Sequence, residues 1–184
     1  MGLKKNKAFM LFMFLLIPIG SYASGDLSAR IGEIRKLYQN TVFNLKKYKQ
    51  FKIDLIEVST EGGEVYFWVD SNNEIKKVKR IIYGETGKKV SEYYYDKDKL
   101  YFVFGVSFFY SMEVDPKTGE YVINYDNPKK EENRYYFFQD EMIQWLGPDK
   151  KKVEVYSNKF EQKSADIIQE SKDILLFCKK KLLK

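Results

Sequence analysis

Apolar residues at helical spacing open and close the chain. Near the start they recur in steps of three and four, at Leu27, Ile31, Ile34, Tyr38, Val42, Leu45 and Tyr48. This spacing places them on one stripe and predicts an amphipathic helix over residues 26–49. A second stripe, made by Phe160, Ile167, Ile174, Cys178 and Leu182, predicts another helix over residues 158–184.

Between the two helices, over residues 51–156, the apolar spacing changes to every second residue. Short apolar runs alternate with glycine, aspartate and asparagine turns and predict about eight strands, at residues 51–55, 65–69, 75–83, 90–95, 100–110, 121–125, 134–138 and 142–146. The connections are too short for crossover helices, so neighbouring strands are expected to be antiparallel. In the fifth strand, alternation predicts one shared core face for Leu100, Phe102, Phe104, Val106 and Phe108.

An internal repeat supports this arrangement. Residues 92–100 match residues 134–142 as an aromatic strand, a polar turn and a second apolar strand, and residues 64–75 form a looser third copy. Two or three hairpins are too few to close a propeller, whose blades need about 40 to 50 residues each. We therefore expect an α+β fold in a single domain of residues 24–184, with a curved antiparallel meander sheet flanked by the two helices.

Residues 1–23 have the three parts of a secretory signal peptide. Lys4, Lys5 and Lys7 precede an apolar run over residues 8–19, and small residues stand at Ser21 and Ala23. The run of 12 residues is short of the ~20 that a membrane-spanning helix needs. The sequence thus predicts export to the periplasm or the extracellular space, with no stable membrane anchor after cleavage behind Ala23.

The positive charge of the chain is concentrated at its two ends. The net charge is +6, but three lysines belong to the predicted leader and four, at positions 179, 180, 181 and 184, lie in the last six residues. Only four of the 32 basic residues are arginine. Arginine is the preferred side chain for binding a base or phosphate through two hydrogen bonds at once. A nucleic-acid partner is therefore not expected.

The hairpin that contains Glu132-Asn133-Arg134-Tyr135-Tyr136-Phe137 and continues to Ile143-Gln144-Trp145-Leu146-Gly147 resembles a hairpin of uncharacterised exported bacterial proteins. The likeness covers about 16 residues. It implies a bacterial exported protein and carries no activity, cofactor or partner with it.

Several kinds of catalytic chemistry are excluded by composition. The chain has no histidine and one cysteine, Cys178, so catalytic triads with histidine, histidine-containing zinc sites and thiolate zinc sites are impossible. No metal or cofactor is expected. Carboxylates remain, with Asp140 and Glu141 near Trp145 in sequence and Asp96 and Asp98 in the equivalent turn. A hydrolase acting on envelope glycans would need two carboxyl groups facing each other across ~5 to 9.5 Å, whereas acids in hairpin turns normally serve the turn.

Aromatic residues are the positive signal, at 17% of the chain. Alternation along the tyrosine-rich strands sends Tyr94 and Tyr136 to the face opposite Tyr93 and Tyr135. One set could line a groove or an exposed patch, and the alternative is that both sets pack as core and cross-strand pairs. Our hypothesis is an exported, non-enzymatic binding or interaction module with Tyr94, Tyr136 and Trp145 in contact with an unknown envelope protein, glycan or lipid-like ligand. The glycan hydrolase is the alternative.

The leader gives the first testable prediction. When the full chain is expressed in a secreting bacterium, the exported protein is expected to begin at Ser24, because the small residues at positions 21 and 23 fit the signal peptidase. Intact-mass measurement of the exported fraction checks this. A mature mass that still includes residues 1–23 would contradict it.

Overall fold

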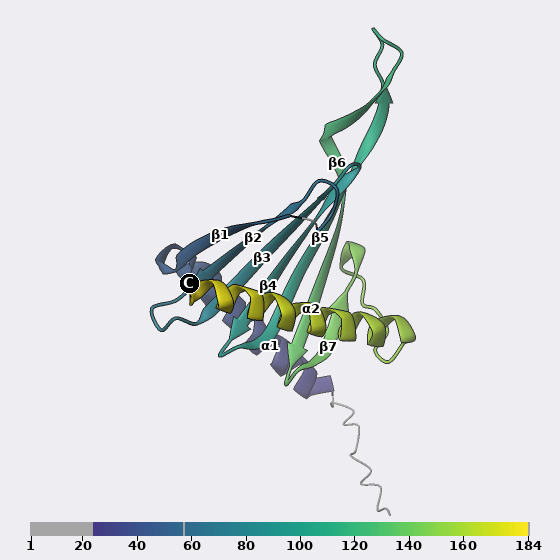
Figure 1. Ribbon diagram of the computed structural model, residues 1–184. Coiled ribbons are helices and arrows are strands. Elements are labelled where there is room, and N and C mark those ends of the chain that lie inside the picture. Colours follow the sequence, from purple (N-terminus) through teal and green to yellow (C-terminus); the bar gives the residue numbers. More distant parts are fainter. Residues whose placement is uncertain (1–23, 57, 184) are drawn as a thin grey trace, which may run out of the picture.

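The computed structural model describes residues 24–56 and 58–183, so the predicted leader lies outside the described residues. One open sheet of seven antiparallel strands, in chain order, stands between two long helices (Figure 1). The elements are α1 (Ser24–Asn44), η1 (Leu45–Lys47), β1 (Lys49–Leu55), β2 (Gly63–Val69), β3 (Ile75–Gly84), β4 (Gly87–Asp96), β5 (Lys99–Val114), β6 (Tyr121–Phe138), β7 (Glu141–Leu146), η2 (Pro148–Lys150) and α2 (Asn158–Leu182).

The two helices cover opposite faces of the sheet (Figure 1). Helix α2 packs on a face built from β2 to β7, and its buried residues are Phe160, Ile167, Ser171, Ile174, Leu175 and Cys178. Helix α1 packs on the other face, where Ile31 and Ile34 contact rings from β4, β5 and β6. The protein therefore has three layers, helix on sheet on helix.

The predicted α+β class and the antiparallel meander are confirmed, and the strand count is seven instead of about eight. The predicted strands 121–125 and 134–138 belong to one long strand, β6, because the charged residues between them also pair with β5. Residues 125–128 bulge out opposite Tyr110, since Phe109 pairs with Lys129 and Ser111 pairs with Asn124. Pro128 is tolerated there because it lies in this irregular part of the ladder.

The internal repeat appears as three hairpins with the same irregularity. In β2–β3, β4–β5 and β6–β7 the returning strand has one extra residue near the turn, namely Lys76, Tyr101 and Ile143. The first repeat strands β4 and β6 lie on either side of β5, so that Phe102 pairs with both Tyr94 and Tyr136. The sequence repeat thus corresponds to a repeated hairpin, and each copy carries a β-bulge in its returning strand.

The bulge at Tyr101 corrects one sequence-based expectation. Leu100 was expected to share a face with Phe102 and Phe104, but it packs beneath α2 whereas they lie on the α1 face. An extra residue in a strand reverses the alternation beyond it. The strand therefore contributes large side chains to both cores.

Each helix is also tied to the sheet by a tyrosine hydroxyl. The Tyr95 hydroxyl donates to the carbonyl oxygen of Ser171 in α2 at 3.1 Å. The hydroxyl groups of Tyr101 and Thr41, in β5 and α1, are hydrogen-bonded at 3.0 Å. Because these groups are buried, the pairs satisfy polar atoms that would otherwise destabilise the cores.

The stacked pair under α2 gives a stability prediction. Phe67 is fully buried and its ring stacks on Phe51 at 4.9 Å, so Phe67→Ala is expected to lower the free energy of unfolding by about 3–5 kcal/mol. Urea unfolding followed by circular dichroism measures the change. Phe43→Ala is the matched control, because Phe43 is 79% exposed on α1 and its loss should cost little. Equal effects of the two changes would contradict the assigned core.

Candidate functional site

The three predicted contact residues do not form one site. Tyr94 and Tyr136 lie together on the α1 face, on either side of Phe102, with ring centroids 5.8 and 5.1 Å from that ring. Trp145 lies on the opposite face with the α2 core. All three are buried, at 1%, 5% and 4% exposure. Their aromatic surfaces are therefore occupied by the protein's own packing.

On the α1 face of the sheet, Tyr94 belongs to a polar network with Glu92 and Lys77. Its hydroxyl donates to the Glu92 carboxylate at 2.7 Å, and the same carboxylate forms an ion pair with the Lys77 ammonium at 2.9 Å. The Lys77 ammonium also lies 5.1 Å from the Tyr94 ring. Burial, followed by the charge of Glu92, raises the pKa of Tyr94 above its ordinary value. These contacts describe a fixed structural tyrosine.

Trp145 is held in a similar way on the other face. Its indole N–H donates to the Asn133 side-chain oxygen at 2.8 Å, and its ring lies 5.4 Å from Tyr135. The Lys159 ammonium of α2 sits over the indole at 5.1 Å. Helix, strand and hydrogen bond together leave little of this ring to a ligand.

A small hollow remains beside Tyr136. It has a volume of about 240 Å³ and is lined by Ile34, Arg35, Tyr38, Phe102, Phe104, Arg134 and Tyr136. Arg134 is already engaged, since its guanidinium pairs with Glu132 at 2.7 Å and lies over the Phe104 ring. The hollow is smaller than the ~300–1,000 Å³ typical of ligand pockets.

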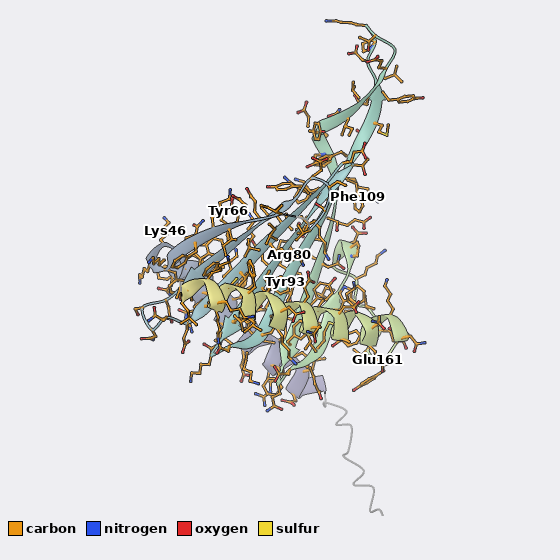
Figure 2. All side chains as sticks on the ribbon, viewed as in Figure 1. Lys46, Tyr66, Arg80, Tyr93, Phe109 and Glu161 are labelled. Carbon is orange, nitrogen blue, oxygen red and sulfur yellow. The ribbon has the colours of Figure 1, made fainter. Side chains whose placement is uncertain are left out.

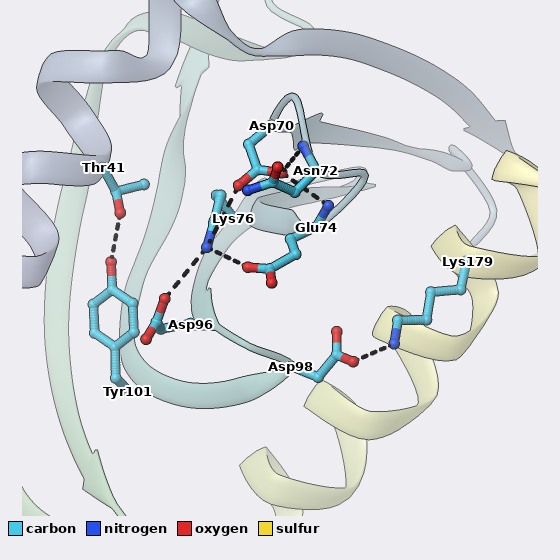
Figure 3. A network of polar contacts seen from close by, with 9 residues as sticks. All are labelled: Thr41, Asp70, Asn72, Glu74, Lys76, Asp96, Asp98, Tyr101 and Lys179. Atoms are coloured by element: carbon cyan, nitrogen blue, oxygen red, sulfur yellow. Dashed lines mark hydrogen bonds and ion pairs between the residues drawn. The ribbon is translucent and has the colours of Figure 1, made fainter.

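The candidate catalytic carboxylates lie in or beside two hairpin turns, and three of them, Asp96, Asp98 and Asp140, are paired with lysines. Asp98 and Asp140 are the second loop residues of the β4–β5 and β6–β7 hairpins and have the positive φ angles that two-residue hairpin loops require. Asp140 accepts from Lys99 at 2.7 Å and Asp98 accepts from Lys179 at 2.5 Å, the latter drawn in Figure 3. Both carboxylates thus occupy turn positions, and lysines neutralise their charges.

Lys76 organises the β2–β3 turn. Its ammonium lies 2.6 Å from Glu74, 3.3 Å from Asp96 and 3.6 Å from Asp70 (Figure 3). Burial opposes its charge, but the hydrogen bonds to Glu74 and Asp96 outweigh that effect and raise the pKa of Lys76. Among the described residues no group of three acidic or cysteine side chains is placed to hold a metal ion.

A group of exposed apolar side chains lies where β5 and β6 extend beyond their neighbours. We call residues 110–128 the arm; Figures 1 and 2 show it projecting from the sheet beyond Phe109. Five of its large side chains are exposed, namely Met112, Val114, Tyr121, Val122 and Tyr125. Met112 pairs with Ile123 and Val114 pairs with Tyr121, so these four residues share one face of the arm.

The other face of the arm is more polar, and its base is hollow. Glu113 accepts from the Asn124 amide at 2.7 Å on that second face. At the base the Tyr110 and Tyr125 rings meet edge to face at 4.9 Å, beside a hollow of about 280 Å³ that Ile123 also lines. The apolar face of the arm thus continues into an aromatic hollow.

The arm was missed in the sequence although a signal was present. The segment Asp115-Pro116-Lys117-Thr118-Gly119 predicts a turn, and apolar residues alternate on both sides of it. The 16 and 18 residues of β5 and β6 greatly exceed the 7 to 10 of β1 to β4. Because β5 and β6 run past the ends of the neighbouring strands, the hairpin that joins them extends beyond the rest of the sheet. Where the strands end could not be read from the sequence.

Comparisons with protein-family models, with curated proteins and with solved structures found no match for this chain. The likeness of its last hairpin to exported bacterial proteins therefore stays a prediction. No helix of residues 24–56 and 58–183 has the length and apolarity that crossing a bilayer requires.

The buried tyrosines predict alkaline sensitivity. Burial raises the pKa of Tyr101 and of Tyr135 to about 12 in the folded protein, from 10.0. The unfolded chain therefore loses these protons first, so their contribution to stability is complete below about pH 10 and is lost as the pH rises. The urea midpoint should fall between about pH 10 and 12, and the part of the 295 nm tyrosinate absorbance that comes from the buried tyrosines should appear on unfolding. Full tyrosinate absorbance at about pH 11 with native circular dichroism would contradict this.

Proposed function

We propose that this protein is an exported, non-enzymatic interaction module that binds a protein partner through its arm. The observation that carries the proposal is the apolar face made by Met112, Val114, Tyr121 and Ile123, of which the first three side chains are exposed and Ile123 is half-buried.

The arm is physically incomplete by itself. A two-stranded hairpin is at best marginally stable in water, because it has no third strand or helix to bury its apolar face. The Tyr110 amide donates to the Thr86 carbonyl oxygen at 2.9 Å. Beyond Tyr110, within the part of the chain that the structure describes, β5 pairs with no strand on the β4 side, and β6 pairs with no strand on the β7 side before Arg134. Exposed strand edges and exposed apolar faces are both surfaces that another chain can cover.

A protein partner fits this surface better than a small ligand does. The aromatic cores on both faces of the sheet are filled by the helices, with Tyr93, Tyr94 and Tyr95 each 1% exposed. A small lipid-like or sugar ligand needs a concave site, whereas the arm is a projecting element. Tyrosine and methionine on a projecting surface are typical of the centre of protein interfaces.

The contacts of the acidic residues support a role without catalysis. Asp140, one of the two carboxylates of the candidate pair Asp140 and Glu141, is paired with Lys99, and Asp98 in the equivalent turn is paired with Lys179. Glu141 lies beside Asp140 in the same hairpin, at an exposed position. The envelope-glycan hydrolase remains the alternative, and no contact in the structure favours it over binding.

Photo-crosslinking tests the proposal. A photoreactive phenylalanine analogue replaces Tyr121 in the full chain, in the bacterium that makes it, and light should link it to one protein of defined mass. The matched control places the analogue at Phe43, which is as exposed as Tyr121, at 79% against 74%, but lies on α1. Adding Met112→Ser and Val114→Ser to the Tyr121 probe should remove most of the adduct, because the apolar face is then polar.

Three outcomes would contradict the proposal. The first is no protein adduct at position 121, and the second is the same adduct at position 43. The third is an adduct that persists when both serines are present while circular dichroism shows an unchanged fold.

A further inference from the structure

A polar hollow lies between α2 and the strands β4, β5 and β6. Its volume is about 430 Å³, within the ~300–1,000 Å³ typical of ligand pockets. The strands contribute Lys89, Ser91, Gly105 and Asn133 to its lining, and α2 contributes Lys163. The hollow shares no residue with the arm, so a ligand bound in the hollow is independent of the partner proposed for the arm.

Small residues on neighbouring strands create this hollow. Helix α2 runs across the strands (Figure 1), and a row of large buried residues that includes Tyr93 and Tyr135 packs beneath it. Two residues away along the same strands, Ser91 pairs with Gly105, and Gly105 pairs with Asn133. Because alternate residues of a strand share a face, this second row also lies on the α2 side. Its members are too small to fill the space beside the helix.

The hollow presents hydrogen-bond donors that have no protein acceptor. Tyr135 is 8% exposed, and among the described residues its hydroxyl forms no hydrogen bond with another protein group. The side-chain oxygen of Asn133 accepts from the Trp145 indole at 2.8 Å, so the two N–H groups of its amide are left for another acceptor. Buried polar groups normally have a partner, and a bound molecule can provide it.

Two lysines give the hollow a positive charge. Within residues 24–56 and 58–183, neither Lys89 nor Lys163 forms an ion pair, although both line the hollow. The Glu170 carboxylate is neutralised by the Arg80 guanidinium. The Asp166 carboxylate accepts a hydrogen bond from an uncharged glutamine amide at 2.8 Å and keeps its charge. Two cations therefore stand against one anion, and the hollow favours a negatively charged ligand.

We propose that this hollow binds a sugar acid, that is, a small molecule with several hydroxyl groups and one carboxylate. The carboxylate pairs with the ammonium groups of Lys89 and Lys163. The Tyr135 hydroxyl and the Asn133 amide donate to oxygen atoms of the ligand, and a hydroxyl of the ligand donates to Asp166. A neutral sugar would lack the charged contact, and a simple anion would lack the contacts of the hydroxyl groups.

Titration calorimetry with D-glucuronate as the probe tests this inference on the purified protein. The comparison ligands are D-glucose, which has no charge, D-glucosamine, which has the opposite charge, and acetate, which has the carboxylate without hydroxyl groups. Glucuronate should bind at least about tenfold more tightly than each of them. Its affinity should fall as the salt concentration rises, because salt screens the lysine charges.

Variants of the lining locate the site. Tyr135→Phe removes only the hydroxyl without a partner and should weaken glucuronate binding about fivefold to tenfold. Lys89→Gln with Lys163→Gln should weaken it at least about tenfold, because both attractive charges are lost. The matched control, Lys36→Gln with Lys180→Gln, removes two exposed lysines elsewhere and should keep most of the affinity.

A further variant fills the hollow and keeps every polar group. A Cβ atom at position 105 would lie 3.8 Å from the Tyr135 ring, which is an ordinary contact, so the backbone of Gly105 accepts a side chain. Gly105→Val should therefore keep the native circular dichroism spectrum. It should weaken glucuronate binding at least about tenfold, because the valine methyl groups occupy the space of the ligand.

The inference is overturned if glucuronate does not bind, or if glucose, glucosamine or acetate binds as tightly. It is also overturned if the lysine variant and its control lose affinity alike, or if a folded Gly105→Val protein binds glucuronate unchanged. The arm variant Met112→Ser should leave glucuronate binding unchanged. Loss of that binding in an arm variant that retains its fold would contradict the assignment to the hollow.

Discussion

Large apolar side chains on both faces of the sheet are the constraint on which the rest of this structure depends. Three consecutive tyrosines in β4 send Tyr93 and Tyr95 to one face and Tyr94 to the other, and β6 repeats the pattern. Each face must then be covered, because rings of this size lose much of their stabilising effect in contact with water. The two ends of the chain provide one helix each. A single helix cannot cover every residue of seven strands, so parts of both faces and the projecting arm stay open.

Much of this arrangement could be predicted from the sequence because it depends on local spacing. The two helical stripes, the alternating strands and the repeat of residues 92–100 at residues 134–142 all correspond to elements that the structure contains. The assignment of faces could not be predicted, since one extra residue at Tyr101 or Ile143 reverses the alternation. The length of β6 was also hidden, because Lys129 to Asn133 have the polar composition of a loop but pair with β5.

The same reversal explains why the predicted contact residues did not meet. Tyr136 and Trp145 belong to adjacent strands of one hairpin, but Trp145 pairs with Tyr135, so it faces α2 while Tyr136 faces α1. An aromatic surplus alone does not distinguish a ligand site from a core, and here two covered faces use more than half of it. Exposed large apolar side chains remain on the arm and at scattered positions such as Phe43 of α1. The arm is not unusual in composition, and it becomes visible only when the ends of the strands are known.

The two ends of the sheet differ in whether their charged groups are paired and their apolar side chains are covered. At the end with the β2–β3, β4–β5 and β6–β7 turns, lysines neutralise the turn carboxylates, as Lys76 does for Glu74 and Asp96. At the opposite end, β5 and β6 continue into the arm (Figure 1). The chain leaves β1 at this end through Ile56, which is 84% exposed. Apolar side chains and unpaired strand edges there are costly for a protein that works alone, because they favour aggregation. The exposed face of the arm, away from the neutralised turns, is the surface on which the proposed binding of another chain rests.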